Sequence, residues 1–120
     1  MSDTVIIDTN IILRYFLDNN LVLEKLVKSG RTLFITFPII FEVVYVMERF
    51  YKIHREQIYE KLMSLITRAE VELEDKMSIS TLNKYRAFKS LSIADAYLAE
   101  LSKYTGYELI TFDKKLKKNV

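Results

Sequence analysis

The stretch TVIIDTNIILRYFL, residues 4–17, sets the pattern of the fold, because a β-branched apolar run passes directly into a helical segment. Residues 4–8 predict a strand buried on both faces, as is typical of parallel sheets. Residues 10–17 predict a short helix, for which Asp8, Thr9 or Asn10 can act as the N-cap. The segment therefore predicts a strand that ends in an acid, followed at once by a helix.

The same alternation of strands and helices continues along the chain. Strands are predicted at residues 32–36, 71–73 and 107–111, and helices at 24–29, 38–51, 55–68, 78–88 and 92–104. Pro38 suits the first turn of its helix, and Gly106 stands just past the end of another. Strands that alternate with helices favour parallel pairing through crossover connections. We therefore predict an α/β fold, a three-layer α/β/α sandwich with a mostly parallel sheet of four to five strands.

Composition indicates one globular domain over residues 1–120. Half of the residues are apolar, 28% are charged, and only two glycines and one proline occur, so neither disorder nor a linker is indicated. The absence of cysteine excludes disulfides and Cys-based zinc sites. No apolar stretch reaches the roughly 20 residues of a membrane span, and no signal peptide is visible, so a cytoplasmic protein is expected.

Glu42 stands where an acid is unexpected, inside the apolar run of residues 37–47. A carboxylate buried there without a partner costs on the order of several kcal/mol, so it needs a cation. That cation is either a metal ion or an arginine or lysine of the chain. Both alternatives remain open.

Three further acids stand at the ends of predicted elements. Asp8 and Asp113 follow strands, and Asp95 falls in the first turn of the helix within LSIADAYLAEL, residues 91–101. Such acids can simply cap helices or form turns. Ser92 and Asp95 also have the spacing of a capping box, which explains Asp95 without any chemistry.

The expected topology brings these acids together. In a parallel α/β sheet the helices run antiparallel to the strands, so helix N-termini lie at the carboxyl edge of the sheet, where such folds bind ligands. Asp8, Glu42, Asp95 and Asp113 all fall at that edge. Closely spaced carboxylates repel each other unless a cation lies among them. Ligand sets made only of oxygen favour hard ions, so we predict an Mg²⁺ or Mn²⁺ site.

Three ordered motifs carry a resemblance to a known family. They are VIIDTNIILRYF (residues 5–16), FPIIFEVVYVMERF (residues 37–50) and LSIADAYLAELSKYTGYELITFD (residues 91–113). With these motifs the chain resembles the PIN-domain family, and specifically the VapC-type toxins of prokaryotic toxin–antitoxin pairs.

The resemblance implies a metal-dependent endoribonuclease that uses the four acids, with Asn10 and Thr111 as polar helpers. It also implies a homodimer and an antitoxin partner that inserts a segment into the acidic groove. Many relatives carry another acid where this chain has Ser92, so the number of metal ions stays open. A single ion is the expectation.

The expected mechanism is attack by a metal-activated water on an RNA phosphodiester. One histidine, His54, cannot perform the two-histidine chemistry of metal-independent ribonucleases. Arg14, Lys114 and Lys115 are candidate phosphate contacts. The terminal lysine run is, on the alternative interpretation, only a solvated end, and the net charge of +2 does not by itself indicate nucleic-acid binding.

Two rival functions come from other classes. One is a catalytically weak PIN-like module that binds RNA or acts as a scaffold. The other is a phosphoacceptor protein, disfavoured because an Asp-nucleophile phosphatase needs a second Asp where this chain has Asn10. Separately, Tyr45, Phe50 and Tyr51 exceed what a small core absorbs, so they form either a subunit interface or contacts under neighbouring helices.

Overall fold

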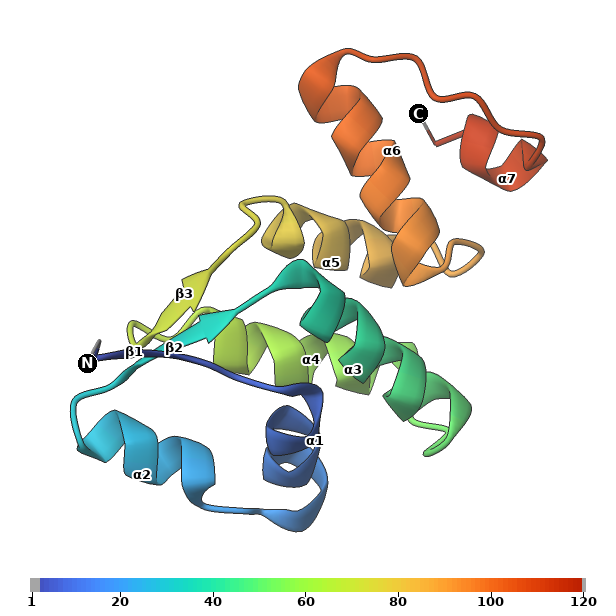
Figure 1. The fold of residues 1–120 in the computed structure, drawn as a ribbon. Coiled ribbons are helices and arrows are strands. Elements are labelled where there is room, and N and C mark those ends of the chain that lie inside the picture. The colour runs from blue at the N-terminus through green and yellow to red at the C-terminus, as the bar shows by residue number, and fades with distance from the viewer. Residues whose placement is uncertain (1–2, 120) are drawn as a thin grey trace. The chain divides into compact units, whose positions relative to one another are not determined.

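The computed structural model describes residues 3–119, and the chain divides into two compact units, residues 1–75 and 76–120 (Figure 1). The first unit contains the sheet and the helices that follow its strands. The second unit contains helices joined by loops. That the whole chain folds as one domain stays a prediction.

A parallel sheet forms the centre of the first unit. It consists of β1 (Thr4–Ile6), β2 (Thr32–Ile35) and β3 (Val71–Leu73), in the order β1-β2-β3. Both pairings are parallel, with Val5 opposite Leu33 and Phe34 opposite Glu72. The predicted α/β class and its parallel sheet are therefore confirmed.

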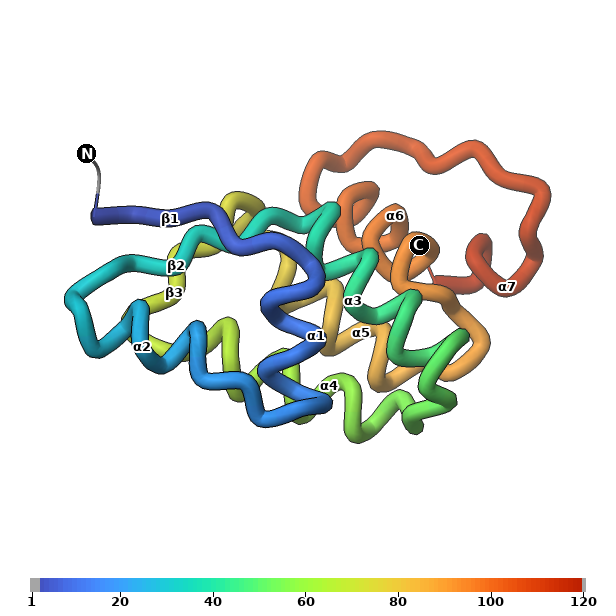
Figure 2. The backbone as a smooth tube through the Cα atoms, turned by 60° about the horizontal axis from the view of Figure 1, so that its bottom comes forward, coloured from blue at the N-terminus to red at the C-terminus, as the bar shows by residue number. Residues whose placement is uncertain are grey.

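Four helices accompany this sheet. They are α1 (Thr9–Asp18), α2 (Val22–Lys28), α3 (Phe37–Arg49) and α4 (Arg55–Ile66). Helix α1 packs against α2 and α3, while α2 lies on β2 and α4 on β3 (Figure 2). Apolar side chains without solvent exposure fill the space between these elements, among them Ile12, Leu23, Leu33, Ile40 and Leu62. The α1–α3 contact matters for function, because it joins the first and second sequence motifs.

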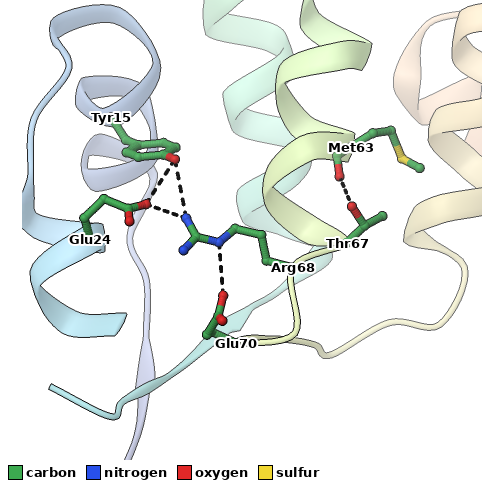
Figure 3. A network of polar contacts seen from close by, with 6 residues as sticks. All are labelled: Tyr15, Glu24, Met63, Thr67, Arg68 and Glu70. Atoms are coloured by element: carbon green, nitrogen blue, oxygen red, sulfur yellow. Dashed lines mark hydrogen bonds and ion pairs between the residues drawn. The ribbon is translucent and has the colours of Figure 1, made fainter. Parts of the chain in front are cut away.

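A polar network ties α1, α2 and the segment between α4 and β3 together (Figure 3). Arg68 donates hydrogen bonds to Glu24, to Glu70 at 3.1 Å and to the hydroxyl of Tyr15 at 3.5 Å. The hydrogen bond from Arg68 lowers the pKa of Glu24, and the Glu24 carboxylate in turn raises the pKa of Arg68. The network therefore favours the charged form of both groups.

The second unit consists of α5 (Ser78–Ala87), α6 (Ile93–Thr105) and the short α7 (Lys114–Lys117). Helices α5 and α6 pack against each other. Leu91, Ala99 and Leu116 form a small buried cluster. Helix α6 ends at Gly106, whose φ of 77° is the left-handed conformation that glycine adopts without steric penalty.

Two expectations about strands are wrong. Residues 107–111 form no strand, so the sheet has three strands among residues 3–119 rather than four to five. Local side chains satisfy the backbone there instead: Tyr107 N donates to Thr105 Oγ1 at 3.1 Å, and Ser102 Oγ donates to Tyr107 O at 2.6 Å.

Strand β1 is also not buried on both faces. Thr4 and Ile6, which point to the same face of β1, are both exposed, Ile6 at 77%. Among the described residues, β1 is an edge strand that pairs only with β2. Within residues 3–119, every helix falls short of the length and apolar character that a membrane crossing requires.

Candidate active site

Asp8 and Glu42 are joined through Thr9 in the first unit. Asp8 is the N-cap of α1, and its Oδ1 accepts a 2.7 Å hydrogen bond from the backbone N–H of Thr9. The side chain of the same threonine donates a 2.9 Å bond from Oγ1 to Oε2 of Glu42 on α3. Thr9 thus contacts both carboxylates and fixes one beside the other.

The two acids open into one hollow of about 410 Å³. Polar groups from the start of α1 and apolar and aromatic groups from α3 and the following turn share its lining. The lining residues are Asp8, Thr9, Asn10, Leu13, Glu42, Val46, Phe50 and Tyr51. The predicted helper Asn10 therefore lies in the same hollow as two of the four predicted acids.

The expectation that Glu42 is buried is wrong, because Glu42 is exposed. Helix α3 buries Ile40, Val43, Val44 and Met47, which recur at the three- and four-residue spacing of one helical face. Glu42 lies off that face, so its side chain is exposed although its neighbours in the sequence are apolar. No lysine or arginine among residues 3–75 forms an ion pair with Glu42, so the alternative of such a pair is wrong for these residues.

A second hollow of about 140 Å³ shares three lining residues with the first. Asn10, Leu13 and Tyr51 line both, and Arg14, Leu17 and Asp18 complete the second. Arg14, a candidate phosphate contact, is exposed. The first unit therefore offers carboxylates, an amide, an aromatic ring and a guanidinium along one continuous lining.

Asp95 lies in the first turn of α6 and forms the predicted capping box. Asp95 N donates to Ser92 Oγ at 3.1 Å, and Ser92 N donates to Asp95 Oδ2 at 3.3 Å. The capping interpretation is therefore confirmed. It engages one carboxylate oxygen of Asp95, Oδ2, and leaves its other oxygen available as a ligand.

Asp113 is the N-cap of α7. Its Oδ1 accepts hydrogen bonds from Lys115 N at 2.9 Å and Leu116 N at 3.3 Å, while its own N–H donates to Thr111 Oγ1 at 3.0 Å. Thr111 thus contacts the backbone of Asp113, and its role as a polar helper stays a prediction. Lys114 and Lys115 are both exposed.

The donor chemistry of the first unit fits part of a hard-metal site. Asp8, Glu42 and Asn10 offer oxygen ligands, the type that Mg²⁺ and Mn²⁺ prefer, and Mg²⁺ commonly completes its shell with water. Within residues 3–75 alone, no three acidic or histidine side chains lie close enough together to hold an ion. The same holds within residues 76–119 alone. Each unit by itself therefore supplies two of the four predicted acids.

Sequence reasoning missed the part played by Thr9 and placed Tyr51 elsewhere. Thr9 was only a candidate N-cap, although its hydroxyl is the direct partner of Glu42. Tyr51, expected either in a subunit interface or buried, is 55% exposed and lines both hollows, and the interface stays a prediction. Burial of the aromatic group under neighbouring helices is wrong for Tyr45, Phe50 and Tyr51, which are all exposed.

Comparison with known proteins gives two matches. The PIN domain family model matches residues 5–119. The VapC ribonuclease of Aquifex aeolicus (strain VF5) is 29% identical over 96 residues, which cover 79% of this chain and 71% of that protein. No solved structure matches the chain.

Proposed function

The chain belongs to the PIN domain family, and from that premise we propose that it is a metal-dependent endoribonuclease, the toxin of a type II toxin–antitoxin pair. Similarity to a protein named VapC ribonuclease supports the ribonuclease activity. The proposal treats residues 1–120 as one nuclease domain acting on RNA.

The single observation that carries this proposal is the Thr9–Glu42 hydrogen bond of 2.9 Å. It brings two exposed carboxylates, Asp8 and Glu42, into one hollow. Two acids held side by side with no neutralising lysine or arginine among residues 3–75 repel each other. A divalent cation would remove that repulsion.

In the proposed site, Asp8, Glu42, Asp95 and Asp113 together hold one Mg²⁺ or Mn²⁺ ion. When bound, such an ion supplies an activated water and offsets charge on the phosphoryl group. Asp8 and Glu42 present oxygens from α1 and α3. Asp95 and Asp113 present oxygens from the start of α6 and the start of α7. No protein nucleophile is needed.

Neighbouring polar groups position the substrate in this proposal. Asn10 and Thr111 bind water or phosphate oxygens beside the acids. Arg14, Lys114 and Lys115 contact the flanking phosphates, and their exposure supports that role. Affinity for RNA should then fall steeply with salt.

Two protein partners belong to the same proposal. One is an antitoxin whose inserted segment presents a basic residue to the carboxylates and so occupies the place of the metal. The other is a second copy of the chain. The exposed ring of Tyr45 on α3, which is 47% accessible, supports a homodimer through that helix.

The direct test is cleavage of labelled RNA by the purified chain in Mg²⁺, in Mn²⁺ and in EDTA. We expect cleavage with either ion and none in EDTA. Asp8→Asn and Glu42→Gln should each abolish cleavage while leaving the fold intact, because both side chains are exposed. Circular dichroism checks the fold.

Glu60→Gln is the matched control, since it removes the same charge from an exposed position on α4 outside the acidic hollow. It should cleave RNA like the unaltered chain. Equal cleavage by Glu42→Gln and Glu60→Gln would contradict the proposed site. RNA binding without cleavage under any metal would instead favour the weak RNA-binding or scaffolding module.

A further inference from the structure

We propose that Tyr51 is a base-stacking residue, which makes this chain selective for single-stranded RNA at the nucleotide beside the scissile phosphate. The inference rests on the proposed ribonuclease function and names a specificity determinant of the same site. Stacking on Tyr51 would also direct the RNA strand from the acids toward Arg14.

Tyr51 lies where the two hollows of the first unit meet. The hollow of about 410 Å³ contains Asp8 and Glu42, the hollow of about 140 Å³ contains Arg14, and Tyr51 lines both. A strand that places one phosphate at the acids and another at Arg14 passes the residues common to both hollows, Asn10, Leu13 and Tyr51, of which only Tyr51 is aromatic. The base between those phosphates meets an exposed aromatic ring.

The turn after α3 holds Tyr51 in a defined position. Tyr51 N donates to Val46 O at 3.3 Å, and Ile53 N donates to Met47 O at 3.0 Å, so the backbone on both sides is anchored to the last turns of α3. Lys52 between them adopts a left-handed φ of 53°, which turns the chain sharply. An aromatic ring on an anchored turn loses little conformational entropy when it binds a base.

The ring of Tyr51 is also available. Phe50 packs edge-on against Tyr45, with ring centroids 6.5 Å apart, whereas Tyr51 has no ring partner among residues 3–75. Its side chain is 55% exposed. Base–aromatic stacking tolerates any base but requires an unpaired one, because the bases of a duplex are already stacked on each other.

The charged lining suits RNA at this position, and the antitoxin segment of the proposed function would compete with RNA for the same acids. The core of a protein interface is depleted of charged residues, but Tyr51 shares one hollow with Asp8 and Glu42 and the other with Arg14 and Asp18. The lining offers three kinds of group: carboxylates for the proposed metal, an aromatic ring and a guanidinium. These groups match the alternation of phosphate and base along a single strand.

The first measurement is the kinetics of the full chain on single-stranded RNA and on a matched duplex. Tyr51→Ala should raise KM for single-stranded RNA by about 5- to 150-fold, the factor that corresponds to the loss of one base–aromatic stack. Tyr51→Phe keeps the ring and should keep the original KM. Cleavage of the duplex is expected to be slow and should not change further in Tyr51→Ala.

A binding measurement separates this inference from the proposed catalysis. The chain has no tryptophan, so Tyr51→Trp introduces a single tryptophan at the proposed stacking position. Combined with Glu42→Gln, which prevents cleavage, it should be quenched by a short RNA oligonucleotide and much less by the same oligonucleotide with an abasic nucleotide at the stacked position. Tyr104→Trp is the matched control, because Tyr104 is 73% exposed near the far end of α6 from Asp95; it should show no such difference.

Three results would overturn the inference. One is unchanged KM in Tyr51→Ala while Glu42→Gln is inactive, which would leave the ribonuclease proposal standing. Another is equal quenching by the intact and abasic oligonucleotides. The third is a change of oligomeric state in Tyr51→Ala, measured by sedimentation, without a change in RNA affinity, which would assign the ring to a protein interface. Absence of cleavage by the unaltered chain, combined with base-dependent quenching, would contradict the ribonuclease proposal alone.

Discussion

Thr9 donates a 2.9 Å hydrogen bond to Glu42 across 33 residues of sequence. The same residue donates its backbone N–H to Asp8, so a single threonine contacts both acids of the first unit. Thr9 itself is 8% exposed, whereas both acids are exposed. A nearly buried anchor that orients two accessible carboxylates is the arrangement expected around a metal ligand set.

The first prediction concerns this anchor. Thr9→Val keeps the branched shape but removes the hydroxyl, so Glu42 loses its orienting partner. Loss of such a partner lowers metal affinity or activity by about 10- to 100-fold in metal sites generally, and we expect a loss of that size in an Mn²⁺ titration of RNA cleavage. Thr9→Ser, which retains the hydroxyl, should restore most of the affinity. Equal titrations for Thr9→Val and the unaltered chain would exclude the role of Thr9.

The second prediction concerns Arg14. If Arg14 neutralises one phosphate, Arg14→Ala should reduce the slope of log affinity against log salt by about 0.7, the contribution of one contact to a single strand. Fluorescence anisotropy at several salt concentrations measures that slope. Lys28→Ala removes an exposed positive charge from α2 and serves as the control. If both variants lower the slope equally, the effect reflects net charge and not a phosphate contact at Arg14.

The third prediction separates capping from chemistry at α6. Ser92→Ala removes the hydroxyl that accepts from Asp95 N and should lower the free energy of unfolding by about 1 kcal/mol, the usual contribution of an N-cap. Asp95→Asn retains an oxygen that can accept from Ser92 N, so it should change stability less. It should nevertheless reduce cleavage by more than about 100-fold, which is the upper end of the loss when a residue that only hydrogen-bonds to a metal ligand is replaced. Urea denaturation and RNA cleavage measure the two effects. Full activity in Asp95→Asn would leave Asp95 with a capping role alone.

The fourth prediction concerns the Arg68 network and its pH dependence. Arg68→Met removes the donor that lowers the pKa of Glu24 from its ordinary 4.5. A carboxyl with a lowered folded-state pKa stabilises the fold above its unfolded pKa, and that stabilisation is lost as pH falls through the folded value. The variant should therefore unfold at lower urea than the unaltered chain at neutral pH, and the difference should shrink below pH 4.5.

Lys25→Met, a charge removal at an exposed position on the same helix as Glu24, is the control for this series. It should show a smaller difference at neutral pH. A difference between Arg68→Met and the unaltered chain that stays constant from neutral to acidic pH would mean that packing of the Arg68 stem, and not its charge, stabilises this region.

Sequence alone determined the local structure of most of the chain. Helix α6 was predicted between Ser92 and Gly106 because a capping box starts a helix, and a left-handed glycine ends one, through contacts with residues only a few positions away. Strand β2 and helix α3 were predicted because a short run of apolar and β-branched residues and a proline in the first helical turn are local signals as well. Asp8, Asp95 and Asp113 were found for the same reason, since each stands at the boundary of such an element, whereas Glu42 was found because it interrupts an apolar run.

Tertiary structure alone decided which groups meet and which stay in solvent. Residues 107–111 have the composition of a strand, but a strand exists only where another strand accepts its hydrogen bonds. Here the backbone of Tyr107 bonds to the side chains of Thr105 and Ser102 instead. The contact of Thr9 with Glu42 depends on how α1 packs against α3. Glu42 is exposed because another side of α3 packs against its neighbours. Which side packs is decided by segments far apart in the sequence, so no short stretch of sequence contains that information.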